Sequence, residues 1–421
     1  MIQTIPILPG ITLRCCRDSR FKQGRLSFQF VRSMDREETA LNALLPDVLL
    51  RGTRVHPSLR SINQYMDANY GVALGSLTRQ SGDYQTCGIG FTFLDERFAL
   101  DGESVLAGVL DFLEEALTQP LVENGAFLPD ILDSEKKNLI SAIESELNNK
   151  GAYAMGQLLN SMGRADRFGL PRLGTVETVA AIQSDSLYRH FQRLLREARI
   201  EVFYVGSMAP EEVAQRIRQL VGKWERSYVN LPDQTPFAPV EPEHLTETMD
   251  VKQGKLCMGF ITPVNNRDDR FAAMQLFNTI FGSGMTSKLF LNVREKLSLC
   301  YSVGSGYYGS KGIVTVGAGI DFDKETQTRE EILRQLKLCQ EGQITAEELQ
   351  AAKAAIYSTI CSIHDTPGAI ENYHSAAAIS GMAMTLEEYR DAVEKTTIDQ
   401  VVAAANTIVY HSSYFLKGVE K

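Results

Sequence analysis

The chain has 421 residues, of which 44% are hydrophobic, and this length exceeds what one hydrophobic core usually supports. We therefore expect two domains of about 200 residues each. The 43 basic and 52 acidic side chains give a net charge of −9, which argues against nucleic acid as the main partner. No apolar run approaches the roughly 20 residues of a membrane helix, and the first residues lack the basic start of a signal peptide. We expect a cytoplasmic protein with no membrane partner.

The seven cysteines are scattered, odd in number and mostly flanked by apolar residues, at positions 15, 16, 87, 257, 300, 339 and 361. This pattern favours reduced thiols in a core over a disulfide framework or a zinc knuckle. Cys15 and Cys16 are adjacent, and neighbouring side chains on a strand point to opposite faces. They are therefore a poor pair of metal ligands.

The first half of the chain, residues 1–225, mixes strand and helix patterns. Alternating apolar residues predict a hairpin of two strands, Ile11 to Cys16 and Arg25 to Arg32. Helical spacing follows over Glu37 to Arg51 and stops at Gly52. Further along we predict two amphipathic helices, a short buried strand and a helix that begins after Pro210, over Glu103 to Leu117, Asp133 to Asn149, Ile200 to Val205 and Glu211 to Val221.

Four prolines among polar residues mark residues 226–250 as a linker. The second domain, residues 251–421, opens with strand and helix patterns again. Thr345 and Glu348 form a capping box ahead of a helix that reaches about Ile363. The remaining predicted elements are a strand, a helix and a closing strand, over Lys255 to Thr262, Arg270 to Phe281 and Tyr410 to Lys417.

An internal repeat relates the two halves. Residues Gly75 to Phe93 align with Gly304 to Phe322, 229 residues later, with identical glycines, serine and phenylalanine at five positions. Self-similarity at a fixed offset indicates homologous halves. Because hairpins replace strict alternation of strand and helix, we predict an α+β protein of two homologous α/β-sandwich domains, each an antiparallel-rich sheet packed by helices.

Motifs of the common hydrolases and nucleotide-binding enzymes are absent: no G-x-S-x-G, H-E-x-x-H, H-x-x-E-H, Walker or Rossmann fingerprint occurs. The six histidines stand at positions 56, 190, 244, 364, 374 and 411, and none has another histidine three or four residues away. No helix face therefore presents two imidazoles to a metal ion.

One segment nevertheless resembles a known zinc helix. Ala43 to Thr53, ALLPDVLLRGT, is similar to the zinc helix of the M16 (insulinase and mitochondrial-processing-peptidase-like) family, whose usual form is H-F-L-E-H-M-L-F-K-G-T. Ala43 and Asp47 stand where the two zinc-binding histidines belong, and Pro46 stands where the general-base glutamate belongs. The resemblance implies an M16 peptidase-like (LuxS/MPP-like) fold of the inactive-subunit type.

These replacements remove the chemistry of the family site. Alanine has no donor atom, a lone aspartate holds zinc weakly, and no group remains to take a proton from water. Pro46 also removes a backbone donor inside a helix, at a cost of ~3 kcal/mol unless the helix kinks. The stretch Asp133 to Glu146 resembles the helix of the third ligand, but Ala142 occupies the ligand position. Glu135 fits an earlier glutamate of that helix, and we interpret it as surface charge.

The second half keeps the family's C-terminal signature. Phe281 to Val303, FGSGMTSKLFLNVREKLSLCYSV, resembles G-x-x-x-S-x-L-F-x-x-V-R-E-K-x-x-L-x-Y-S. In the family the arginine and tyrosine of this string contact substrate from the half opposite the zinc, and the tyrosine hydroxyl can donate to the oxyanion. Here they are Arg294 and Tyr301. The alternative is that Arg294 pairs with Glu295 and Tyr301 is a half-buried residue of a sheet.

The resemblance therefore implies a non-catalytic subunit that binds peptide. In two-chain members of the family, the zinc of one chain faces the second domain of the other. We expect this chain to complement a zinc-bearing H-x-x-E-H paralogue as a heterodimer, with Arg294 and Tyr301 acting in trans, zinc only in the partner, and no autonomous activity. A purely scaffolding subunit and a hydrolase with another site are the alternatives, and a homodimer of the isolated chain stays open.

Overall fold

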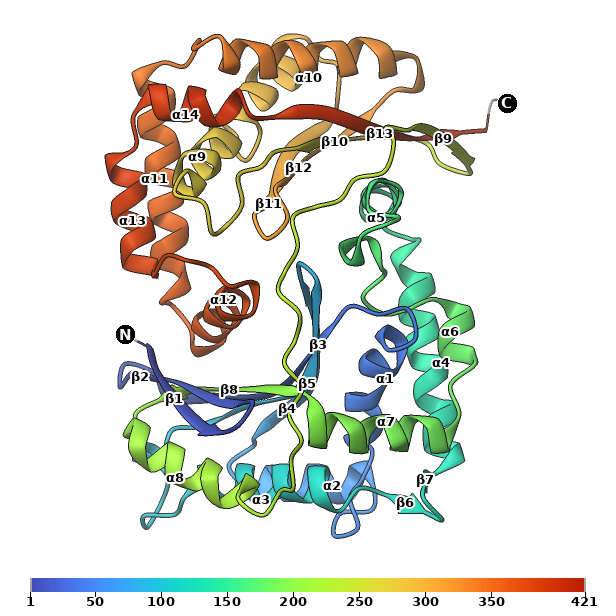
Figure 1. The fold of residues 1–421 in the computed structure, drawn as a ribbon, viewed down its shortest axis with the longest axis vertical. Coiled ribbons are helices and arrows are strands. Elements are labelled where there is room, and N and C mark those ends of the chain that lie inside the picture. The colour runs from blue at the N-terminus through green and yellow to red at the C-terminus, as the bar shows by residue number, and fades with distance from the viewer. Residues whose placement is uncertain (1, 420–421) are drawn as a thin grey trace. The chain divides into compact units, whose positions relative to one another are not determined.

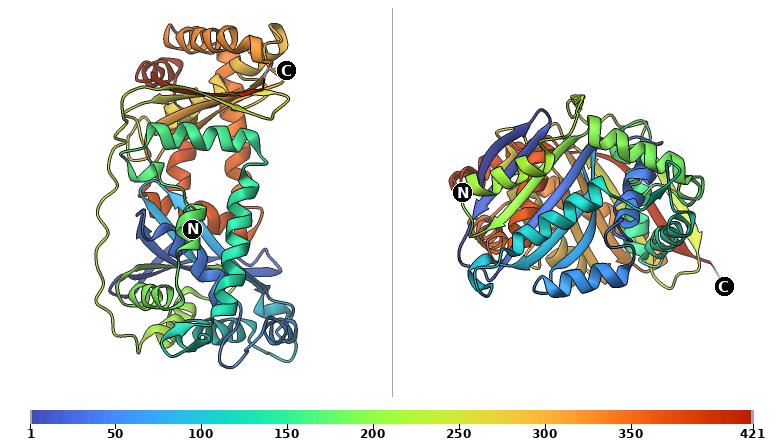
Figure 2. Two further views of the ribbon diagram at one scale, coloured as in Figure 1. Left: turned by 90° about the vertical axis from the view of Figure 1, so that its right-hand side faces the viewer. Right: turned by 90° about the horizontal axis from the view of Figure 1, so that it is seen from below.

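A computed structural model of the chain describes residues 2–419, which form two compact units. Unit 1 comprises residues 2–144, 171–233 and 363–379, and unit 2 comprises residues 145–170, 234–362 and 380–419. Each half of the chain thus contributes one helical segment to the unit built mainly from the other half. Residues 222–243, which include the first part of the predicted linker 226–250, run without helix or strand (Figure 2).

Unit 1 contains a six-stranded sheet in the order β1-β2-β8-β3-β5-β4 (Figure 1). The predicted hairpin of residues 11–16 and 25–32 is wrong, because β8 lies between β2 and β3, parallel to the first and antiparallel to the second. The strand β8 is buried on both faces, which suits a central position in a sheet. The strands are β1 Ile2–Leu8, β2 Ile11–Arg17, β3 Gln23–Ser33, β4 Ala73–Ser81, β5 Tyr84–Leu94 and β8 Arg199–Gly206.

One face of this sheet carries the main hydrophobic core of unit 1, under helices that include α3, α7 and α8 (Figure 1). Large apolar side chains from neighbouring strands, such as Leu13, Phe28 and Phe91, meet Phe112 of α3 there. The predicted helices are present within a few residues, and Pro210 is the first residue of α8. The helices of unit 1 include α1 Thr39–Leu49, α2 Leu59–Ala68, α3 Val105–Thr118, α4 Pro129–Glu146, α6 Val176–Ala180, α7 Ser184–Glu197 and α8 Pro210–Val221.

The other face of the sheet carries the helix α12, Pro367–Ser380, which meets both polar and apolar side chains there. Glu371 of α12 is 1% exposed. Its carboxylate accepts two hydrogen bonds from Arg79 at 2.9 and 3.0 Å, one from Ser27 at 2.9 Å and one from Gln29 at 2.8 Å. A buried carboxylate needs such partners, so the strand residues fix the helix in place.

The two adjacent cysteines confirm the strand geometry predicted for them. Cys15 lies in the main core of unit 1, whereas Cys16 contacts Val205 and Ile370 on the opposite face. All seven cysteines are free. All are buried except Cys361, which is exposed. Burial raises the pKa of the Cys15 thiol to about 12, so this residue is an inert core thiol at neutral pH.

Unit 2 contains a five-stranded sheet in the order β11-β12-β10-β13-β9. Its edge strand β9 lies within the segment predicted as a linker, and pairs in parallel with β13. The helix α5, Lys150–Met162, packs on this sheet against β10 and β13. The strands are β9 His244–Met249, β10 Gly254–Ile261, β11 Ser302–Tyr308, β12 Ile313–Ile320 and β13 Val409–Gly418.

Further helices of unit 2 are α9 Phe271–Phe281, α10 Glu325–Gln340, α11 Ala346–Ile363, α13 Leu386–Lys395 and α14 Ile398–Ala405. The capping box predicted before α11 is confirmed. The Thr345 backbone N–H donates to the Glu348 carboxylate at 2.9 Å, and the Glu348 N–H donates to the Thr345 hydroxyl at 3.1 Å. Within residues 2–419, no helix has both the length and the apolar character that crossing a membrane requires.

The internal repeat is visible as an antiparallel strand pair at the edge of each sheet. Gly75 of β4 faces Gly90 of β5, and Gly304 of β11 faces Gly317 of β12. The first pair is joined by residues 82–83 and the second by residues 309–312. The predicted α+β class, with two sheets each packed by helices, is confirmed.

We predict that Glu371→Ala destabilises the chain by about 3–5 kcal/mol, because it removes the buried carboxylate that compensates the charge of Arg79. Urea unfolding followed by circular dichroism measures the change. The exposed Glu330 of α10 provides a matched control, and Glu330→Ala should change stability by less than about 0.5 kcal/mol. Equal effects of the two substitutions would contradict a structural role of the Glu371 cluster.

Candidate functional site

The helix α1 holds the three positions that match the zinc helix. It runs unbroken from Thr39 to Leu49 with Pro46 inside it, and the Leu50 N–H donates to the Pro46 carbonyl at 3.1 Å. Proline therefore does not end the helix, although no N–H at position 46 can reach the Asn42 carbonyl. Ala43 is buried in the core of unit 1 and offers only a methyl group.

Asp47 is the one acidic side chain at these positions. Burial raises the pKa of Asp47, and the nearby Glu135 carboxylate raises it further, while a hydrogen bond from Ser76 of β4 opposes both effects. The carboxylate is thus engaged by a neutral hydroxyl in a partly desolvated place. Its surroundings disfavour the charged form that a zinc ligand needs.

Glu135 of α4 is 6% exposed, so its interpretation as surface charge is wrong. Its carboxylate accepts a hydrogen bond from Arg51 at 2.6 Å and another from Asn138 at 3.0 Å. Desolvation of a carboxylate is costly unless a cation pairs with it, and the Arg51 guanidinium meets that need. Ala142, two turns further along α4, brings no side-chain donor atom.

The residues at this place do not fit zinc. Ala43 and Ala142 have no ligand atoms, Asp47 is held by a hydroxyl, and Glu135 is neutralised by Arg51. In the described part of the chain, no three His, Cys, Asp or Glu side chains gather in a group that could hold a metal ion.

The second group of predicted site residues belongs to unit 2. Arg294 lies in a π-helical segment, Leu289–Lys296, and its side chain is 41% exposed. The guanidinium sits 4.7 Å from the ring centre of Phe290, and its Nε lies 3.6 Å from the Glu295 carboxylate. Such an exposed ion pair is weak, so the cation stays available to an anionic or carbonyl group from outside.

Tyr301 immediately precedes β11 and is 60% exposed, so it is not a half-buried residue of the sheet. Its backbone N–H donates to the Gly319 carbonyl at 2.8 Å, which fixes the position of the residue. Its hydroxyl donates to Asp321 at 2.9 Å, and this hydrogen bond raises the pKa of the phenol. Tyr301 is therefore a neutral donor at pH 7.

The sequence named Glu295 as a possible partner of Arg294, and the two side chains lie 3.6 Å apart, but the other partners of the site residues were not predicted. Phe290 could have been found, because it precedes Arg294 by four residues on a helical segment and the two therefore share a face. Asp321 stands inside the second copy of the repeat, which offers a weak signal. Arg51 and Glu135 are 84 positions apart, and no local pattern connects them.

Comparison with known proteins finds similarity along almost the whole chain. A family model described as "Peptidase M16 inactive domain" matches residues 181–356. The "Probable inactive metalloprotease YmfF" of Bacillus subtilis (strain 168) is 27% identical over 411 residues, covering 98% of this chain and 96% of the relative. The chain is thus similar to proteins of the M16 peptidase family along almost its whole length. An "Uncharacterized zinc protease" of Streptomyces coelicolor is 26% identical to this chain over 390 residues, covering 89% and 80% of the two chains.

Solved structures agree with the fold of the chain. A conserved protein from Enterococcus faecalis V583 superposes with a TM-score of 0.90 at 25% identity, over 100% of this chain and 99% of that one. A peptidase M16 inactive domain from Pseudomonas fluorescens has a TM-score of 0.82 at 17% identity and shares the fold over 100% and 98% of the two chains. The fold of the chain is therefore M16 peptidase-like over its whole described length.

We predict that Asp47→Asn stabilises the protein at pH 7. The folded state raises the pKa of Asp47 above its ordinary 3.8, so the folded protein carries an unfavourable charge once the pH exceeds the raised pKa. The amide removes that charge, and its advantage should shrink as the pH falls towards about 4. Urea midpoints across this range measure the difference. Asp111→Asn, at an exposed position of α3, is the matched control for replacing an aspartate by asparagine.

Proposed function

We propose that this chain is a non-catalytic subunit that binds peptide and complements a zinc-bearing H-x-x-E-H paralogue in a heterodimeric metallopeptidase. Arg294 and Tyr301 would act in trans, at the partner's metal. One contrast carries the proposal. The positions that would hold zinc are filled by groups that cannot, whereas Arg294 and Tyr301 of the C-terminal signature are exposed.

The chemistry of the two exposed side chains suits the stabilisation of developing negative charge. A partner's zinc would supply the polarised carbonyl and the activated water. The Tyr301 hydroxyl is a neutral donor whose acceptor, Asp321, can be exchanged for a substrate oxygen. The Arg294 guanidinium offers several hydrogen-bond donors, and its contact with the Phe290 ring holds it in one place.

Peptide binding is supported by the edges of the sheets. In unit 1, β4 is an edge strand whose one partner in the sheet is β5. An extended peptide can add to such an edge through main-chain hydrogen bonds. The net charge of −9 favours neutral or basic peptides, although only weakly. Free thiols suit a reducing compartment, and we propose the cytoplasm as the location.

The test is to mix the purified chain with a paralogue that carries H-x-x-E-H and to measure peptide hydrolysis. We expect neither the zinc-free chain nor its variants to hydrolyse peptide alone. In the mixture, Arg294→Ala and Tyr301→Phe should each lower kcat/KM, with losses on the order of a hundredfold for a lost oxyanion donor. Matched controls are Arg390→Ala and Tyr357→Phe, which change exposed residues outside the signature.

The same experiment separates the alternatives. Unchanged kcat/KM in both signature variants would remove the role in trans. If labelled peptide binds neither the chain nor the complex above an empty control, a scaffolding subunit is the better description. Stoichiometric zinc in the pure chain, measured by elemental analysis, would instead point to a hydrolase with a site of its own.

A further inference from the structure

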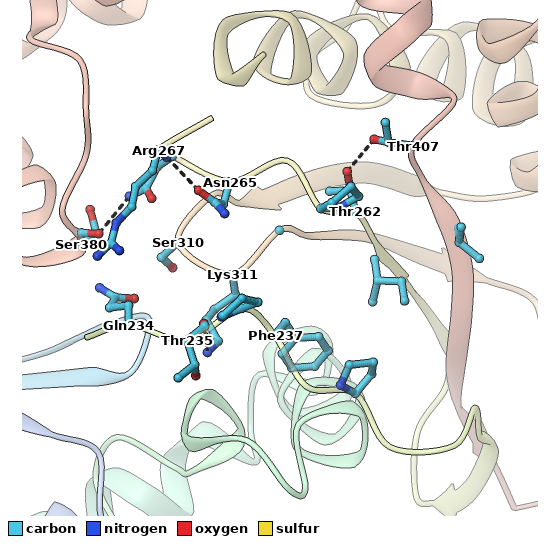
Figure 3. A pocket seen from close by; sticks show the side chains of 17 residues that line it. Gln234, Thr235, Phe237, Thr262, Asn265, Arg267, Ser310, Lys311, Ser380 and Thr407 are labelled. Carbon is cyan, nitrogen blue, oxygen red and sulfur yellow. Dashed lines mark hydrogen bonds between the residues drawn. The ribbon is translucent and has the colours of Figure 1, made fainter. Parts of the chain in front are cut away.

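Unit 2 contains a cavity of ≈ 520 Å³ that the proposed function does not use. It is enclosed by the end of β10 and the loop that follows, the turn between β11 and β12, the start of β13, and residues 234–239 (Figure 3). Its volume lies within the range of about 300–1,000 Å³ that small-molecule sites occupy.

The lining divides into an apolar body and a polar end. The body is formed by side chains such as Phe237, Ile261 and Val409, together with several prolines. Arg267, Asn265 and Ser310 contribute the polar groups, and Figure 3 shows Arg267 extending away from Phe237, at the other end of the cavity. A mostly apolar pocket with a few polar groups at one side is the usual form of a ligand site.

A buried ion pair holds one wall of the cavity. Lys311 Nζ lies 3.0 Å from the Asp166 carboxylate, and the two side chains are 0% and 2% exposed. Lys311 also donates to the Thr235 carbonyl at 2.9 Å, and Asp166 accepts from the Ala238 N–H at 3.0 Å. Breaking a buried ion pair is strongly destabilising, so the pair itself stays in place. Its hydrogen bonds to the backbone therefore hold residues 234–239 as one wall of the cavity.

Aromatic packing and a turn complete the fixed walls. Phe237 meets Phe168 edge to face, with ring centres 6.4 Å apart, and Phe168 meets Tyr308 in the same manner at 5.5 Å. The Thr262 N–H donates to the carbonyl of Gly312 at 2.9 Å, where a φ of +69° favours glycine. The cavity is therefore formed before any ligand arrives.

Arg267 is the charged residue at the polar end of the cavity. It is exposed, and its guanidinium has no ion-pair partner in residues 2–419. The guanidinium lies against Gly381, where an added Cβ would be 2.8 Å from Nη2. Its backbone N–H donates to the Asn265 side chain at 2.9 Å. An unpaired guanidinium fork at the polar end of an apolar cavity matches a carboxylate with an apolar body.

We propose that this cavity binds apolar carboxylic acids, with the carboxylate on Arg267 and the apolar body against Phe237 and Ile261. The acid can come from two sources, a medium-chain fatty acid or the C-terminal residue of a peptide with an apolar side chain. The site involves neither Arg294 nor Tyr301, so it stands whether or not the chain acts in a heterodimer.

Titration calorimetry on the full chain tests the proposal with octanoate and with acetyl-Leu-Phe, each compared with its neutral amide. We expect at least one acid to bind, and its amide to bind about tenfold more weakly or worse, because a charge-assisted pair is lost. Arg267→Gln should weaken binding of the acid by a similar factor. The matched control is Arg270→Gln, since the Arg270 guanidinium is already paired with Asp268 at 2.7 Å.

A second variant tests the apolar body of the cavity. Val409 is 59% exposed at the rim, so Val409→Trp should leave the fold intact, as checked by circular dichroism, and should abolish binding of the acid by filling the space. Binding of octanoate alone identifies a small acid, and tighter binding of the peptide acid identifies a peptide C-terminus. The proposal is overturned if neither acid binds, if acid and amide bind equally, or if Arg267→Gln or Val409→Trp binds the acid like the unmodified chain.

Discussion

The carboxylate of Glu371 ties a helix from the last part of the sequence to strands from the first part. It is buried against the face of the unit 1 sheet that carries α12, where Arg79, Ser27 and Gln29 satisfy it. A charge in such a place is tolerable only when its partners are present. The sheet face therefore requires the helix, and the helix requires the sheet. In unit 2 the helix α5 makes the corresponding exchange, but it does so with apolar side chains such as Leu158 and Met162.

The same requirement applies to the acidic side chains beside α1. Each carboxylate that is removed from water there needs a partner. Glu135 of α4 is buried, and Arg51, which follows α1, forms an ion pair with it. At Asp47 the Ser76 hydroxyl opposes the rise in pKa that burial causes. The side chains at these positions thus support the packing of unit 1, and their local contacts agree with its fold.

How far the sequence predicts this structure depends on the range of the interactions. The capping box of Thr345 and Glu348 spans four residues, and the structure shows it as predicted. The hairpin predicted for residues 11–16 and 25–32 is wrong, because β8 arrives from about 180 positions away and inserts between the two strands. At the candidate site, the motif located Ala43, Asp47, Arg294 and Tyr301. It could not reveal Arg51 as the partner of Glu135, since no local pattern spans that distance.

The proline-rich stretch also shows how long-range contacts limit prediction from sequence. Its composition indicates a passive linker, yet residues 234–239 form a wall of a cavity because Lys311 and Asp166 hold them. Two arginines of unit 2, Arg294 and Arg267, differ in what surrounds the guanidinium group. Arg294 lies over the ring of Phe290 and near Glu295, whereas the Arg267 guanidinium lies against Gly381 and has no ion-pair partner within residues 2–419. With no carboxylate of its own, Arg267 is the one of the two that is prepared for an acid brought by a ligand.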